Sequence, residues 1–100
     1  MERLVVENTY DIPVTDEARA DWSRSLSPCL EAYGARWKRS YLSRDRKRMI
    51  CEFEAPDAES IRTAVRNAGL KFDRVWVADV YGPDVPGHPQ PEGAAPREDG

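Results

Sequence analysis

The chain has 100 residues, 33% of them charged and 40% hydrophobic, and this length is enough for one domain with a modest core. Its net charge of −3 falls in the last 19 residues, because the 14 basic and 14 acidic side chains before Gly82 balance. A neutral body excludes bulk electrostatic attraction to nucleic acid or to an anionic membrane.

Neither a membrane span nor a secretion signal is evident. No apolar run is long enough to cross a bilayer, and Met1 to Arg3 lead directly into a predicted strand without a signal-peptide core. The two cysteines, Cys29 and Cys51, lack CxxC spacing. We therefore expect a cytoplasmic protein with two reduced thiols.

The first third of the chain predicts a strand followed by a helix. Residues 3–10 are rich in β-branched and aromatic side chains, and Thr15 is a suitable N-cap for the helix after them. Pro28 predicts a kink or break in this helix, and Gly34 ends it. The apolar stripe at helical spacing consists of Ala18, Trp22, Leu26, Cys29, Leu30 and Tyr33.

Two strands joined by a polar turn follow. Residues 35–42 predict a strand with Trp37 and Tyr41 on one face, opposite Arg36, Lys38 and Ser40. Residues 48–54 predict the next strand, after a turn over residues 43–47. In it, two sets of side chains alternate, namely Met49, Cys51 and Phe53 against Ile50, Glu52 and Glu54.

The last part of the body predicts a second helix and a fourth strand. Asp57 is placed to cap the helix, Gly69 ends it, and residues 73–81 form the strand. The buried stripe of this helix consists of Ile61, Ala64, Val65 and Ala68. Residues 82–100 hold five of the eight prolines and four of the six glycines, which predicts a disordered acidic tail.

The order of elements is βαββαβ, which predicts an α+β ferredoxin-like domain over residues 1–81. Right-handed crossovers place both helices on one face of a four-stranded antiparallel sheet. The last strand alternates Trp76, Ala78 and Val80 with Val75 and Val77, so both of its faces are apolar. We therefore expect a second copy to cover the open face, which gives a homodimeric α+β barrel.

Several segments of the body together form a recognisable pattern, namely Leu4 to Glu7, Thr15 to Glu17, Tyr33 to Trp37, Ser40 to Ser43, Cys51 to Pro56, Glu59 to Arg62 and Asp73 to Val75. In these segments the body resembles a family of small bacterial ferredoxin-like proteins that includes a nickel-binding streptomycete protein. The resemblance implies the fold and dimerisation, and it makes nickel a possible ligand. This chain differs from the family in the second helix, where relatives carry a histidine and this chain has Ala64, Val65 and Arg66.

A metal site would use imidazole or thiolate ligands. The only histidine, His88, lies in the predicted tail, so Cys29 and Cys51 are the candidate metal ligands, if the first helix packs over the third strand. The alternative is that both thiols are small buried hydrophobic groups.

Glu7, Glu52, Tyr41 and Arg66 are the other candidate site residues. Glu7 and a glutamate of the third strand fall on neighbouring central strands, where two carboxylates could act as an acid–base pair or simply pair with basic neighbours. Eight aromatic residues could line an organic-ligand pocket, or they could fill the core and the dimer interface. Tyr41, which is one of them, and the basic residue Arg66 are the candidates for the pocket.

Two functions fit these features. The first, favoured by the resemblance, is a small non-enzymatic protein that binds a metal ion or small ligand in the dimer cleft. The second is a cofactor-free dimeric α+β barrel enzyme of the isomerase, cyclase or monooxygenase type. In that enzyme Glu7 or Glu52 is the base, and Tyr41 or Arg66 polarises a small organic substrate.

Overall fold

The computed structural model describes residues 1–85. The predicted tail beyond Val85, including His88, therefore lies outside the described residues. The predicted βαββαβ order is confirmed, and the elements are β1 (Glu2–Thr9), α1 (Asp16–Ala32), β2 (Arg36–Leu42), β3 (Arg48–Ala55), α2 (Ala58–Asn67) and β4 (Arg74–Ala78).

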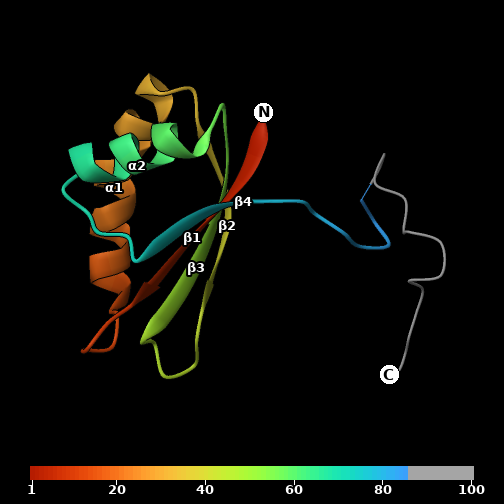
Figure 1. Ribbon diagram of the computed structural model, residues 1–100. Helices are drawn as coiled ribbons and strands as arrows, with labels where there is room; N and C mark the ends of the chain where they lie inside the picture. Colours follow the sequence, from red (N-terminus) through yellow and green to blue (C-terminus); the bar gives the residue numbers. More distant parts are fainter. Residues whose placement is uncertain (86–100) are drawn as a thin grey trace.

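The four strands form one antiparallel sheet in the order β2-β3-β1-β4. Both helices lie on the same face of this sheet, and the segment after β4 leads away from it (Figure 1). The predicted ferredoxin-like fold is therefore confirmed. Strand β4 is shorter than predicted, since it ends at Ala78.

The helices begin and end at the residues that the sequence indicates. The Thr15 hydroxyl accepts from the Ala18 amide at 3.0 Å, and the Asp57 carboxylate accepts from the Ser60 amide at 2.8 Å. These bonds satisfy amides that have no partner inside the helix. Gly34 follows α1 with φ of +68°, a left-handed conformation that a side chain disfavours.

Of the kink or break predicted at Pro28, the break does not occur, because α1 continues through this residue to Ala32. Pro28 lies on an exposed side of the helix, so the carbonyl that it leaves unpaired can be hydrated. One residue earlier, the Ser27 hydroxyl donates to the Ser23 carbonyl at 2.9 Å. A proline in the chain therefore weakens this helix locally without ending it.

The core lies between the sheet and α2. Leu4 and Phe53 are cross-strand partners on the helix-covered face, and they cluster with Ile61 and Val65 of α2. Leu30 is the one buried residue that α1 adds. Full burial of such a side chain stabilises the fold by about 1.5–3 kcal/mol, so these contacts hold the two layers together.

Strand β2 contains a β-bulge that the sequence does not predict. Trp37 lies opposite Phe53 and Arg39 opposite Glu52, so Lys38 is an extra residue. Beyond the bulge, Ser40 pairs with Cys51 on the helix-covered face, and Tyr41 lies on the open face. The prediction that Tyr41 shares a face with Trp37 is therefore wrong, because the extra residue shifts the alternation by one.

Neither helix within residues 1–85 is long and apolar enough to span a bilayer.

Candidate functional site

A cleft of about 340 Å³ lies between α1 and the helix-covered face of the sheet. It forms because no Cα atom of α1 lies within 8 Å of a Cα atom of β1 or β3, whereas α2 approaches both strands and β4. Helix α1 packs instead against α2 and β2. The volume falls in the lower part of the range of small-molecule sites, about 300–1,000 Å³.

Apolar and aromatic side chains form most of the cleft wall. Helix α1 contributes Trp22, Leu26 and Leu30, spaced so that they face the sheet together. The Trp22 ring stacks on Tyr10, with 5.3 Å between ring centroids. The cleft is lined by four of the eight aromatic residues that the sequence analysis names as possible pocket residues, namely Tyr10, Trp22, Trp37 and Phe53.

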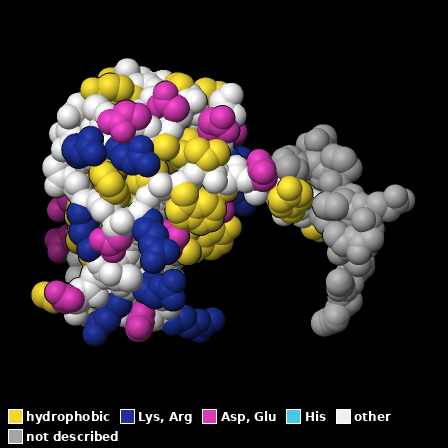
Figure 2. All heavy atoms as spheres, viewed as in Figure 1, with side chains coloured by type: hydrophobic (Ala, Val, Ile, Leu, Met, Phe, Trp, Pro, Cys, Tyr) yellow, Lys and Arg dark blue, Asp and Glu magenta, His cyan; other side chains and the backbone are white. Residues whose placement is uncertain are grey.

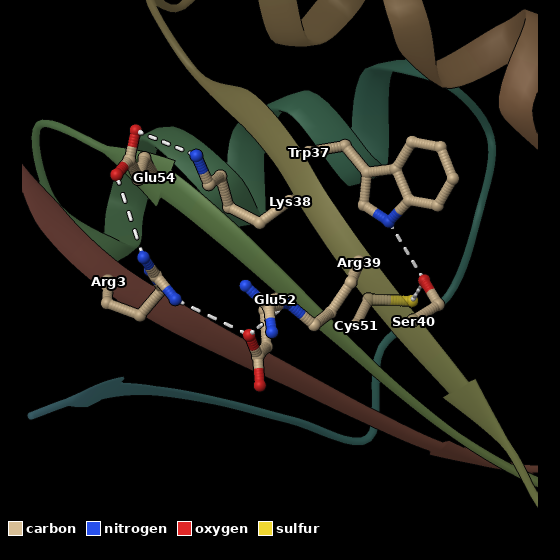
Figure 3. A network of polar contacts seen from close by, with 8 residues as sticks. All are labelled: Arg3, Trp37, Lys38, Arg39, Ser40, Cys51, Glu52 and Glu54. Atoms are coloured by element: carbon tan, nitrogen blue, oxygen red, sulfur yellow. Dashed lines mark hydrogen bonds and ion pairs between the residues drawn. The ribbon is translucent and has the colours of Figure 1, made fainter. Parts of the chain in front are cut away.

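A short chain of hydrogen bonds lies on the sheet side of the cleft (Figure 3). The Trp37 indole donates to the Ser40 hydroxyl at 2.9 Å, and this hydroxyl donates to the Cys51 sulfur at 3.0 Å. Burial raises the pKa of the Cys51 thiol above its ordinary value. The thiol is therefore neutral at pH 7, and the sheet side of the cleft is uncharged but polar at this point.

Two basic side chains, Arg19 and Lys71, line the cleft, and no acidic residue of the described chain does. Arg19 pairs with Asp16 at 3.7 Å, and Lys71 pairs with Asp73 at 3.5 Å. The Lys71 ammonium also lies 4.7 Å from the centre of the Tyr10 ring. The cleft wall is therefore positive on balance.

The two candidate metal ligands differ in position. Cys51 lines the cleft and Cys29 does not, although both are free cysteines that are half-buried against the core. Among residues 1–85 there is no group of three or more His, Cys, Asp or Glu side chains that could hold a metal ion. One thiol that already accepts a hydrogen bond does not provide the ligand set that nickel needs, so these residues do not fit it.

Glu7 and Glu52 lie on the open face of the sheet, as their register requires. Glu7 accepts from the Trp76 indole at 2.6 Å, and Glu52 pairs with Arg3 at 3.4 Å and Arg39 at 3.3 Å. Figure 3 shows this network continuing to Glu54 and Lys38. The two carboxylates thus share a face, but they contact donors and cations and lie on the opposite side of the sheet from the cleft.

The two pocket candidates, Tyr41 and Arg66, do not line the cleft. Tyr41 is 53% exposed on the open face. The Arg66 guanidinium lies 3.7 Å from Glu59 and 5.5 Å from the centre of the Phe72 ring. A ligand role for these residues stays a prediction.

The cleft residues that were not predicted as site candidates include Arg19, Ser40 and Lys71. Arg19 lies one turn before Trp22 and therefore on the same side of α1, so the helical spacing could have indicated it. Ser40 reaches the cleft only because of the β2 bulge. Lys71 follows α2 in a loop, where no periodic signal exists.

Residues 4–77 match the family described as "Nickel responsive protein SCO4226-like". The chain belongs to this family. The crystal structure of SCO4226 from Streptomyces coelicolor A3(2) is similar, with a TM-score of 0.73 and 12% sequence identity over 80% of this chain and 99% of that chain. At such identity the likeness shows the fold alone. No curated protein matches the chain. The resemblance inferred from the sequence is confirmed.

Proposed function

We propose that this member of the SCO4226-like family is a non-enzymatic binding protein whose cleft holds a small organic ligand. The observation that carries the proposal is the 340 Å³ cleft, with its aromatic wall and few convergent polar groups. Small-molecule sites commonly have this character, since apolar surface supplies affinity and a few polar groups fix orientation.

The site offers both kinds of contact. The stacked Tyr10 and Trp22 rings present a broad apolar surface, and Trp37 adds a third ring from the sheet side. The Ser40 hydroxyl and the Cys51 thiol supply weak polar contacts nearby. A planar ligand with a small polar group suits this combination.

The enzymatic alternative has no comparable support. Its proposed bases, Glu7 and Glu52, lie on the open face of the sheet and not in the cleft. Glu52 is held between Arg3 and Arg39, which is the arrangement of a surface ion-pair network.

Ligand binding can be tested by two-dimensional ¹H–¹⁵N NMR, because the chain has three tryptophans. Trp22 and Trp37 line the cleft, whereas Trp76 lies on the open face. Titration with a set of small neutral aromatic compounds is expected to shift the indole N–H signals of Trp22 and Trp37 and to leave that of Trp76 in place.

A matched pair of variants locates the binding. Ser23 lines the cleft, whereas Ser25 is an exposed residue of α1 outside it. Ser23→Trp is expected to weaken binding at least tenfold by filling the cleft, and Ser25→Trp to leave it unchanged. Equal binding by both variants, or no shift of Trp22 and Trp37 with any compound at millimolar concentration, would contradict the proposal.

Nickel is not part of this proposal, because the described residues do not fit it. Ligands that bind only the folded state raise the melting temperature as their concentration rises. We expect no such rise for the purified chain titrated with Ni²⁺. A saturable rise that is lost in Cys29→Ser or Cys51→Ser would show instead that a thiol site exists.

We propose further that the open face of the sheet is covered by a second copy of the chain, in the cytoplasm. Tyr41 and Trp76 are large and are 53% and 45% exposed there, and the half-buried Ile50 is the cross-strand partner of Tyr41. Figure 2 shows apolar side chains gathered at the sheet on the side away from the helices, near acidic and basic groups. Solvent-exposed apolar surface of this kind favours association of two protein chains.

Sedimentation velocity tests the dimer. We expect a dimer at micromolar concentration and a shift to monomer in Trp76→Lys, which places a charge in the apolar part of the face. Ser25→Lys, at an exposed position of α1, makes the same change of charge away from the open face and serves as the control. A folded wild-type monomer at every concentration would rule out the dimer.

A further inference from the structure

We propose that the cleft is selective for small aromatic anions, such as aromatic carboxylates, and that Arg19 and Lys71 recognise the anionic group. The inference deepens the proposed binding function and depends on it. It goes further by giving the ligand a charge and by assigning two residues to that charge.

The charge of the cleft wall is the first support. Among the described residues that line the cleft, Arg19 and Lys71 are the only ones that carry a full charge at neutral pH, and both are positive. The nearby amide of Asn8 is already engaged, because it donates to the Lys71 carbonyl at 3.2 Å and accepts from the Asp73 amide at 2.9 Å. The cations are thus the strongest polar groups available to a ligand.

Both cations retain capacity for a ligand. The Arg19 side chain is 46% exposed and its partner Asp16 is 81% exposed, at a separation of 3.7 Å. Exposed pairs of this geometry contribute little, so an anion can replace the contact. Lys71 pairs with Asp73 and donates to the Thr9 carbonyl, yet an ammonium has three donors.

The aromatic pair connects the two cations. Lys71 lies over the Tyr10 ring, Tyr10 stacks on Trp22, and Arg19 precedes Trp22 by one helical turn. A planar ligand that packs along these rings therefore brings an attached carboxylate within range of cations from two different elements. The stacked rings of Tyr10 and Trp22 thus determine where the anionic group of the ligand lies relative to Arg19 and Lys71.

Within residues 1–85, no side chain that lines the cleft carries a negative charge to oppose an anion. Burial raises the pKa of the Tyr10 hydroxyl, and the pKa of the Cys51 thiol is raised for the same reason, so both are neutral at pH 7. The acidic partners Asp16 and Asp73 are absent from the lining residues. A cationic ligand would meet two like charges in the same place.

A matched pair of probes tests the preference, namely 2-naphthoate and its neutral analogue 2-naphthamide. Their rings are the same, so the two compounds differ in charge at one substituent. In ¹H–¹⁵N NMR titrations at low salt, we expect both to shift the Trp22 and Trp37 indole signals, with at least tenfold tighter binding of naphthoate. Screening weakens exposed charge contacts, so this difference should shrink in high salt.

Two double variants assign the charge contact. Arg19→Gln with Lys71→Gln is expected to reduce naphthoate affinity to that of naphthamide and to leave naphthamide binding unchanged. Arg44→Gln with Arg62→Gln removes the same charge outside the cleft, so it controls for the overall field. Because Lys71 also contacts Thr9, the single variant Arg19→Gln provides the same test with less risk to folding, with an expected partial loss of about threefold or more.

The outcomes separate the two proposals. Equal binding of both probes at the cleft would overturn the anion preference and leave the binding function standing. Loss of naphthoate affinity in the control double variant alone would also overturn the assignment to Arg19 and Lys71. If neither probe shifts Trp22 or Trp37, and the neutral set also fails to do so, both the preference and the binding function are wrong.

Discussion

The two helices cover the same face of the sheet, but they do so in different ways. Helix α2 has 10 residues and buries Ile61, Ala64 and Val65. Helix α1 has 17 residues and buries only Leu30. The shorter helix therefore holds the core together, and the longer one forms the outer wall of the cleft.

Side-chain size accounts for the difference. Ala64 lets the backbone of α2 approach the sheet closely, and Ile61 fills the contact. On α1, by contrast, Trp22 stacks on Tyr10, so two large rings stand between this helix and the sheet. Close approach gives stability, and a helix held away from the sheet gives space for a ligand.

Truncating a buried side chain should destabilise the protein far more in α2 than in α1. Ile61→Ala should lower the free energy of unfolding by about 2–5 kcal/mol, because it leaves an enclosed cavity in the core. Leu26→Ala should cost about 1 kcal/mol, because it widens a cleft that is already open. Urea unfolding at pH 7 measures both. Equal losses would show that the helices share the core evenly.

Pro28 offers a second test of the difference between α1 and α2. Replacing it by alanine restores an amide and removes the clash of the ring with the preceding turn, so Pro28→Ala should stabilise the protein by about 1–3 kcal/mol. Slower amide hydrogen exchange in α1, with little change in α2, is the expected readout. A lower stability would show instead that α1 needs the proline for its position against the cleft.

A smaller change in stability is expected in the loop after α2, at Asp73. Asp73 accepts from the Thr9 amide at 2.7 Å, and this bond, more than any other contact, holds the pKa of the carboxyl below its ordinary value. The ionised Asp73 carboxylate therefore contributes to the free energy of unfolding above about pH 4, the ordinary pKa of this group. This contribution is lost as the pH falls through the lower pKa of the folded state.

Asp73→Asn should accordingly be less stable than wild type at pH 7, and the difference should narrow as the pH is lowered below about 4. Urea unfolding of both proteins from pH 7 to pH 2.5 measures this. Asp11→Asn removes an exposed carboxylate that makes no hydrogen bond within residues 1–85, and it controls for the loss of one negative charge. A constant gap between wild type and Asp73→Asn over the whole pH range would refute the assignment.

Much of the fold follows from local patterns. The alternation of Met49, Cys51 and Phe53 with Ile50, Glu52 and Glu54 separated the two faces of β3, and Thr15 and Asp57 marked the starts of the helices. These signals are local because a strand exposes every second side chain and a helix cap acts within one turn. The order of elements then limited the topology to very few arrangements.

The candidate site followed much less directly. The sequence supplied Cys51 and the aromatic set, but Tyr41 and Arg66 lie outside the cleft, and Arg19 and Lys71 were not recognised. The bulge at Lys38 depends on how β2 pairs with β3, so alternation within β2 alone cannot reveal it.

The elements, their order and the family of this protein can be inferred from the amino-acid sequence, because each of them depends on neighbours in the chain. The distance of α1 from β1 and β3, and the two cations that line the resulting space, become visible only in the folded chain. The shape of a cleft depends on the sizes of side chains from several distant segments, and these segments meet only after the layers have packed.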